Sequence, residues 1–330
     1  MTTVIRRRSP LIASLIALGL VLGACASGPN QVNSAAIVGG KTIGVNEVQD
    51  LVDKAVKVEP AVRVLADQRK LNLVSRAVLR QLVLHELIAD YSTKQRVTVE
   101  PAQVTQLAEQ ISASLQEFPD DGSASPEAIV QQAVNRAFDA EYLARDYLLL
   151  AQFGREQLSK LSVTFDFTLV AAGEQAAAGS LRGQAVDKAK QMAQSPEAAA
   201  KVIDADVAAG AQAAKGETLT PALAPEIAGT VIFGAPAGSV IAFQPNPEQA
   251  NWVVAVIHKR GFDGKPAAEK EDDPRVATSL GRRLLQSTGE ELGIKISPRY
   301  GVWDASDMNV AADDSLTVGV VFPIKNAKQQ

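Results

Sequence analysis

The chain contains a single cysteine, Cys25, so no disulfide within one chain can hold its fold together. Its stability must therefore come from an apolar core. Hydrophobic residues make up 46% of the 330 positions but aromatic residues only 5%, so the sequence predicts a core packed mainly from small aliphatic side chains. A chain of this length can bury such a core in one or two domains.

Cys25 also lies at the end of an N-terminal segment with the layout of an export signal. Three arginines precede an apolar stretch that is too short to span a bilayer, and small residues follow it. The closing residues Leu-Gly-Ala-Cys resemble a bacterial lipobox, in which the cysteine thiol receives a diacylglyceryl group. We expect residues 1–24 to be a lipoprotein signal peptide and residues 25–36 to be a tether. Lipidated Cys25 would hold the chain in the cell envelope, at the outer face of the cytoplasmic membrane.

The charge of the chain limits its partners. It carries 33 lysines and arginines against 37 aspartates and glutamates, and the expected signal peptide removes three arginines and no acid. Such an acidic chain lacks the basic surface of a nucleic-acid-binding protein or of a protein held on anionic lipid by lysines and arginines. Attachment to the membrane would then depend on the acyl chains at Cys25.

Residues suited to catalysis or metal binding are sparse. The two histidines, His85 and His258, are far apart in the sequence, and the usual metal, nucleotide and nucleophile motifs are absent. We expect each histidine to be packed in the fold or exposed rather than catalytic, and we expect no metal and no cofactor. The adjacent pair Arg282 and Arg283 is expected to be solvated surface charge.

Residues 37–160 predict a lobe that is almost entirely helical. Apolar residues recur at intervals of three and four in its first helix, as at Val48 and Val52. A longer helix follows with apolar residues around much of its circumference, which indicates a position in the centre of a bundle. Pro101 and Pro126 are typical of first helical positions and mark two further helix starts.

The pattern changes after residue 160. Val163 to Leu169 alternates between apolar and polar residues, as in a strand. Two helical segments and several β-branched segments separated by glycine and proline follow. Residues 161–264 therefore predict a compact α+β domain.

The C-terminal part, residues 272–330, begins with another helix, which Asp273 caps and which ends near Gly293. The short strand expected at Ile294–Ile296 should lie in the same lobe as a strand at Ile37-Val38. All of residues 272–330 are expected to return to the helical lobe, which makes that lobe discontinuous.

Two short segments carry a family resemblance. Ile37–Ile43, followed by Glu47, looks like an opening strand, turn and first helix, and Ser297–Asp304 is similar to an NPRYG.WD segment. Both resemble the SurA/PrsA type of envelope chaperone and foldase lipoprotein. The element order of residues 161–264 is similar to that of a parvulin, the peptidyl-prolyl isomerase domain of that family. The resemblance implies an α+β fold in which a discontinuous helical chaperone lobe carries an inserted parvulin-like domain.

The inserted domain departs from parvulins at the positions of their two histidines. The first matches the run Phe167-Thr168-Leu169 and the second the run Trp252-Val253-Val254, while Phe233 matches a residue of the parvulin pocket. The barrier to rotation of a prolyl bond is ~18–20 kcal/mol, and lowering it requires polar groups around the twisted carbonyl. Apolar side chains cannot supply them. We therefore expect a degenerate domain with no catalytic residue and little or no isomerase activity.

The resemblance then implies a membrane-anchored, chaperone-like lipoprotein that binds unfolded or partly folded exported proteins. Two alternatives stay open. The chain could be an active parvulin-type isomerase dependent on Phe167 and Phe233, or a scaffold lipoprotein that recruits one partner in the envelope. Tyr300 and Trp303 are expected to pack against the chain's own core, with partner binding as the alternative.

Overall fold

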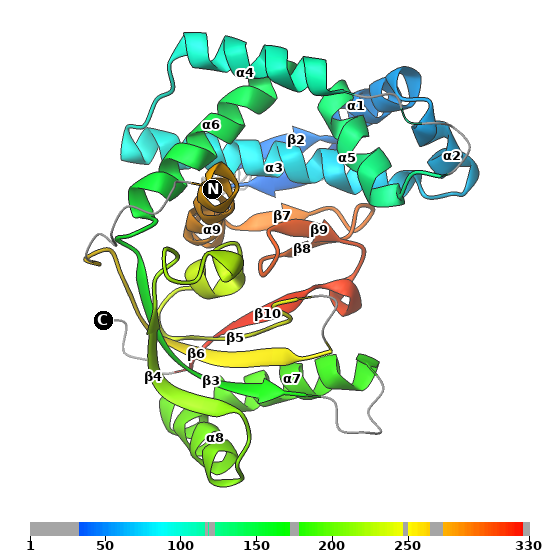
Figure 1. Cartoon of the computed structure of the whole chain (residues 1–330). Coiled ribbons are helices and arrows are strands. Elements are labelled where there is room, and N and C mark those ends of the chain that lie inside the picture. Colours follow the sequence, from blue (N-terminus) through cyan, green and yellow to red (C-terminus); the bar gives the residue numbers. More distant parts are fainter. Residues whose placement is uncertain are drawn as a thin grey trace, which may run out of the picture.

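The computed structural model describes residues 33–115, 118, 123–171, 178–246, 250–264 and 273–325. Cys25, the expected signal peptide and most of the tether lie outside these residues. The fold is mixed α+β, as predicted: helices gather in one lobe, and a five-stranded sheet with two helices lies below it (Figure 1). None of the helices within the described ranges has the length and hydropathy of a membrane span.

The helical lobe is built around one long central helix. That helix, α3, packs against α1, α5, α6 and the later helix α9, and apolar residues on several of its sides are buried, as its sequence predicts. The lobe's helices before the inserted region are α1 (Val45–Val58), α2 (Ala61–Asp67), α3 (Leu71–Gln95), α4 (Pro101–Ser114), α5 (Pro126–Ala137) and α6 (Ala140–Gln157).

Local sequence signals explain where these helices begin. Pro101 and Pro126 occupy the first turns of α4 and α5, as expected from their missing N–H groups. The Ser125 hydroxyl accepts a hydrogen bond from the Ala128 amide at 3.2 Å, and the Asp139 carboxylate caps α6 in the same way.

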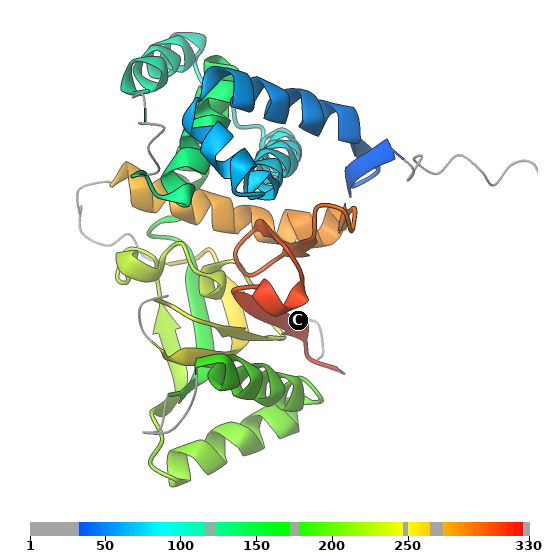
Figure 2. The ribbon, with the colours of Figure 1, turned by 90° about the vertical axis from the view of Figure 1, so that its right-hand side faces the viewer.

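Helix α9 (Pro274–Leu292) returns to this lobe and runs between it and the sheet (Figure 2). Its closest neighbour is α6. A Cβ atom on Gly154 of α6 would lie 1.8 Å from the Ala277 carbonyl oxygen, and one on Gly281 of α9 would lie 1.9 Å from the Leu150 carbonyl oxygen. The two helices therefore approach this closely only because both positions are glycine.

A three-stranded antiparallel sheet joins the two ends of the helical lobe. Its strands lie in the order β2 (Lys41–Gly44), β1 (Ser34–Val38) and β7 (Ile294–Ile296), and Ile37 of β1 pairs with Lys295 of β7. The two segments expected to share a lobe therefore lie side by side. A hairpin of β8 (Val302–Asp304) and β9 (Asn309–Ala311) follows.

The inserted region forms most of the five-stranded antiparallel sheet, whose order is β10-β5-β6-β3-β4. Helices α7 and α8 cover one face, and the 3-10 turns η2 and η3 precede β5 (Figure 1). The bounds are β3 (Ser162–Val170), α7 (Ala178–Met192), α8 (Pro196–Ala208), β4 (Ala213–Leu219), η2 (Pro225–Ile227), η3 (Val231–Phe233), β5 (Ser239–Phe243) and β6 (Trp252–Gly261).

The two faces of this sheet belong to different cores. Towards α7 and α8, Val240 and Val254 pack in a separate cluster. On the opposite face, Ile241 and Ile257 belong to the same apolar cluster as Leu84 of α3. The inserted region is therefore joined to the helical lobe by a continuous core rather than attached by its linkers alone.

The C-terminal segment departs from the prediction at its last strand. Helix α9 and β7 return to the helical lobe, but after the 3-10 turn η4 (Asp314–Leu316) strand β10 (Gly319–Pro323) adds to the edge of the five-stranded sheet, where Val321 pairs with Ile241. Val320 and Phe322 pack against the cluster beneath α7, and Val321 packs against the larger core. Successive side chains of a strand point to opposite faces of a sheet, so an apolar strand is favoured where each face of the sheet has its own apolar core. The expectation that all of residues 272–330 join the helical lobe is thus wrong for β10.

Candidate functional site

A groove of about 310 Å³ lies between α1 and α3, beside the segment that follows β7. Helix α1 contributes Val48 and Val52 from its predicted apolar stripe, and the Ser297–Asp304 motif contributes Tyr300. The groove thus combines the first helix of the lobe with the C-terminal motif. We call it the α1–α3 groove; its lining residues are Val48, Gln49, Val52, Asp53, Leu71, Asn72, Ser75, Arg76, Arg299 and Tyr300.

Six polar side chains of the α1–α3 groove, namely Gln49, Asp53, Asn72, Arg76, Arg299 and Tyr300, have no hydrogen-bond or ion-pair partner in the described part of the chain, and three of them can act only or chiefly as donors. The Tyr300 hydroxyl is buried, as expected for a residue packed against its own core, and makes no hydrogen bond. The guanidinium groups of Arg76 and Arg299 are likewise uncommitted, although Arg299 lies over the Tyr300 ring at 5.6 Å from its centroid. Partial burial lowers the pKa of Arg76 below its ordinary value. These groups are available to donate to a ligand.

A second groove, of about 290 Å³, lies on the other side of α3. We call it the α3–α6 groove. Half of its lining residues are aliphatic, and Tyr147, which also lines it, is 37% exposed. Leu84, Ile111 and Leu150 come from three different helices, so the bundle geometry creates this surface. Its lining residues are Gln81, Leu84, Ile88, Ile111, Ser114, Asn135, Leu143, Asp146, Tyr147 and Leu150.

Asp146 gives the α3–α6 groove a buried carboxylate. His85 Nδ1 lies 2.8 Å from Asp146 Oδ1, and Gln81 Nε2 donates to Oδ2 at 3.0 Å. The His85 ring stacks on Tyr142 with 4.1 Å between centroids, so His85 is a packed residue, as expected. Burial raises the pKa of Asp146, and the hydrogen bonds from His85 and Gln81 oppose this rise. Sequence analysis missed Asp146, because only the packing of α3 on α6 brings it to His85.

His258 contacts a different carboxylate, at the end of β6. Its Nε2 lies 3.0 Å from Asp166 Oδ2 of β3, and the side chain is 47% exposed. Asp166 also accepts a hydrogen bond from the Gly216 amide at 2.8 Å. The structure therefore assigns the two histidines to separate pairs, and no group of three potential metal-ligating side chains occurs among the described residues.

Apolar side chains occupy the positions matched to the parvulin histidines. Phe167 of β3 pairs with Ala255 of β6, and Leu169 pairs with Val253. Phe167 and Val253 are half-buried against the larger core, and Phe233 is fully buried within it. The matched positions thus lie on neighbouring strands and support the core. The low isomerase activity expected from the sequence stays a prediction.

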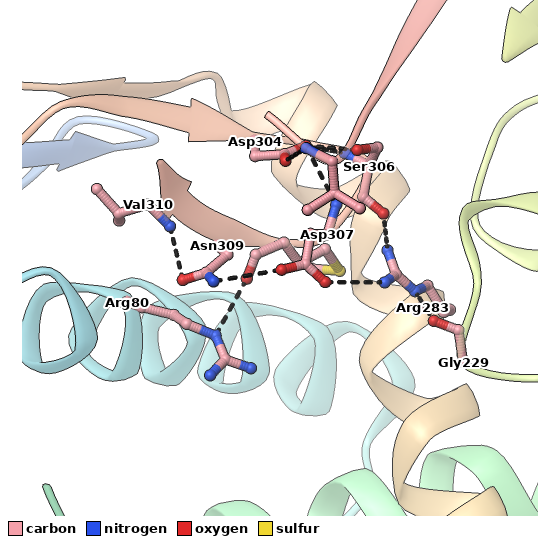
Figure 3. Close-up of polar contacts among 10 residues, drawn as sticks. Arg80, Gly229, Arg283, Asp304, Ser306, Asp307, Asn309 and Val310 are labelled. Carbon is pink, nitrogen blue, oxygen red and sulfur yellow. Dashed lines mark hydrogen bonds and ion pairs between the residues drawn. The ribbon is translucent and has the colours of Figure 1, made fainter. Parts of the chain in front are cut away.

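Arg283 lies at a buried junction of three segments and is not solvated charge as expected; it is 3% exposed (Figure 3). Its Nε donates to the Gly229 carbonyl of the inserted region, and Nη1 donates to the Ser306 carbonyl at 2.7 Å. The carboxylate of Asp304 accepts from the Ser306 amide at 2.9 Å and from the Val318 amide at 2.6 Å. Burial lowers the pKa of Arg283 to about 10. The prediction failed because Arg283 points from α9 towards the interface, a direction that the charge alone does not reveal.

Comparison with known families assigns the N-terminal part of the chain. Residues 1–146 match the model of the SurA-like N-terminal domain, which confirms the resemblance to SurA/PrsA-type chaperones and supports a chaperone-type role. No curated protein matches the chain. The matched region ends inside α6 and contains all of the α1–α3 groove except Arg299 and Tyr300. The parvulin-like character of residues 161–264 stays a prediction.

Proposed function

Because residues 1–146 match the model of the SurA-like N-terminal domain, we propose that the chain is a chaperone for exported polypeptides, which it binds unfolded or partly folded in the α1–α3 and α3–α6 grooves. The observation that carries this proposal is the presence of two apolar grooves on one helical lobe. Side chains that protrude from an unfolded chain gain free energy by entering such grooves, at roughly 25 cal/mol per Å² of apolar surface removed from water.

The proposal includes a lipid anchor at Cys25. Residues 34–36 of the expected tether belong to strand β1, so the tether expected at residues 25–36 is too long by these three residues, and residues 25–33 would join the fold to the membrane surface. Cys25→Ala should abolish acylation, since Cys25 is the only thiol of the chain. Mass spectrometry of the protein extracted from envelope membranes checks this. A wild-type protein without a diacylglyceryl group would contradict the anchor, but not polypeptide binding.

The proposal also assigns little or no isomerase activity to the inserted region. Its support is the apolar character of Phe167 and Val253, which offer no hydrogen bond to a twisted prolyl carbonyl. A proline-containing tetrapeptide assay tests this point. Acceleration of cis-to-trans conversion that is lost on Phe167→Ala would favour the isomerase alternative.

Suppression of aggregation by the purified protein tests polypeptide binding. We expect a chemically unfolded client to scatter less light after dilution when the protein is present at stoichiometric ratio. Leu71→Glu in the α1–α3 groove and Ile111→Glu in the α3–α6 groove should each weaken client binding by about tenfold, because each places a charge in an apolar groove.

Leu223→Glu is the matched control for these two variants. Leu223 is 67% exposed in the inserted region and lines neither groove, so the same change of charge should leave client binding unaltered. Absence of both suppression and client binding would overturn the proposal. A single stable partner co-purifying from envelope membranes, with no preference for unfolded chains, would favour the scaffold alternative.

A further inference from the structure

The α1–α3 groove differs from the α3–α6 groove in the charge at its edge. The α3–α6 groove carries the carboxylate of Asp146, which His85 and Gln81 already contact. The α1–α3 groove carries two arginines and the Tyr300 hydroxyl, all without polar partners in the described residues. The donors of these three side chains are therefore free to contact a ligand in the groove.

The chemistry of these donors specifies the ligand. Guanidinium groups present forked N–H donors that match a carboxylate, and a phenolic hydroxyl adds one further donor. A buried hydroxyl without a partner costs about 1–3 kcal/mol, so a ligand that accepts from Tyr300 removes this cost. The neighbouring Val48, Val52 and Leu71 supply an apolar surface beside the donors.

We propose that the α1–α3 groove binds client segments in which an apolar residue neighbours an aspartate or glutamate. This inference rests on the proposed function and adds the class of sequence that the groove selects. The apolar side chain contacts Val48, Val52 and Leu71, and the acidic side chain accepts from Arg76, Arg299 and Tyr300. Asp53 also lines the groove, so the arginines leave it with one net positive charge.

The net positive charge of the α1–α3 groove is opposite in sign to the charge of the whole chain. The protein carries a formal net charge of −4, so long-range attraction does not favour acidic segments. Selection of an acidic residue must therefore come from short-range contacts in the groove. Rising ionic strength should weaken the contact with the exposed Arg299 more than the contact with the partly buried Arg76, because salt screens exposed charges more strongly.

Three peptides that differ at one position test the proposal. Each carries the same apolar residue followed by Glu, Gln or Lys, with both ends blocked so that the glutamate is the only carboxylate. Binding to the purified protein, measured by fluorescence anisotropy, should be about tenfold tighter for the Glu peptide than for the Gln peptide, and weakest for the Lys peptide. The ratio of the Glu and Gln affinities is the informative quantity.

Variants of the three donors should change this ratio. Arg76→Gln combined with Arg299→Gln should bring it close to one, and Tyr300→Phe should lower it about threefold, since it removes only the hydroxyl. Arg299 is exposed, so Arg299→Gln alone is a second variant that is expected to fold. Lys54→Gln combined with Lys57→Gln removes the same charge from exposed positions of α1 outside the groove and should leave the ratio unchanged.

The outcomes separate this inference from the proposed function. Equal binding of the Glu and Gln peptides would overturn the selectivity while leaving polypeptide binding in place. No binding of any peptide, together with no suppression of aggregation, would overturn the function itself. Selection restricted to a peptide with a free C-terminal carboxylate would overturn the choice of an internal acidic residue.

Discussion

The helical lobe and the inserted sheet both carry apolar surface, and two grooves of about 310 and 290 Å³ lie on the lobe. In the sheet, Phe165, Ile241 and Ile257 face the lobe and are buried in the common core. The opposite face is covered by α7 and α8. These residues of the sheet thus help to hold the molecule together, whereas part of the apolar surface of the lobe lines grooves.

This difference suggests a division of roles. A domain that lacks polar groups at the positions matched to the parvulin histidines can still serve as a rigid platform, because its core is continuous with the lobe. Helix α9 contacts both α6, which lines the α3–α6 groove, and the 3-10 turn η3 of the inserted region. The difference between the lobe and the sheet can be tested with substitutions that weaken packing or polar contacts. Their effects are measured as changes in the free energy of unfolding or in hydrogen exchange.

The largest effect is expected at the crossing of α6 and α9. Gly281→Ala would place a Cβ atom 1.9 Å from the Leu150 carbonyl oxygen, so the two helices would have to move apart. We expect the free energy of unfolding, measured by urea denaturation, to fall by about 3 kcal/mol or more. Gly183→Ala in α7 is the control: a Cβ atom meets nothing within 4 Å there, and removal of a helical glycine should stabilise the protein by up to about 1 kcal/mol. A Gly281→Ala protein as stable as wild type would contradict the close approach of α6 and α9.

A smaller loss is expected at the buried junction of Arg283. Arg283→Met keeps most of the side-chain volume but leaves the Gly229 and Ser306 carbonyls without this donor. An unsatisfied buried acceptor costs about 1–3 kcal/mol, so we expect a loss of about 2–3 kcal/mol in urea denaturation. Arg275→Met at an exposed position of the same helix should change stability by less than about 0.5 kcal/mol. Equal losses in the two variants would contradict the role of the junction.

Local signals in the sequence predicted the helical lobe well. Prolines at first helical positions and apolar residues spaced by three and four depend on neighbours in the chain, so α1, α4 and α5 could be expected. The apolar stripe also predicted Val48 and Val52 on the inner side of α1, next to the groove.

Other features that depend on distant segments were not predicted, although the strands at residues 37–38 and 294–296 were expected in one lobe and pair there. An apolar run such as Gly319–Pro323 carries no information on which sheet it will join, because an edge strand forms wherever an unpaired edge is available. The sequence does not show that Arg283 is buried at a junction, because this burial arises only when the inserted region packs against α9. For the same reason, Arg299 and Tyr300 could be recognised as a motif but not placed beside Arg76.

The attachment of β10 can be loosened without changing either core. Arg182 of α7 donates to the Thr317 carbonyl at 3.2 Å and to the Asp314 carbonyl at 2.9 Å. Arg182→Ala should reduce stability by about 1 kcal/mol and increase hydrogen exchange in residues 314–323, because these contacts hold the start of β10. Lys190→Ala, at an exposed position later in α7, is the control. Unchanged exchange in Arg182→Ala would show that pairing with β5 alone holds β10.

The smallest effect is expected from the titration of Asp146 at the α3–α6 groove. Because burial raises the pKa of Asp146, the folded protein retains this proton to a higher pH than the unfolded chain does. The contribution of Asp146 to stability therefore falls as pH rises from the ordinary pKa of 3.8 through the raised value, and it is constant above that value.

The Asp146→Asn variant tests this, because asparagine does not titrate. The free energy of unfolding is measured for the variant and for wild type over a range of pH, and the difference between the two cancels the contributions of most other titrating groups. This difference should shift in favour of the variant as pH rises. In a His85→Gln background the shift should grow, because the hydrogen bond that favours the ionised carboxylate is lost. A difference independent of pH would mean that Asp146 is as well solvated as an exposed carboxylate, and the α3–α6 groove would then be wetter and less apolar than its lining indicates.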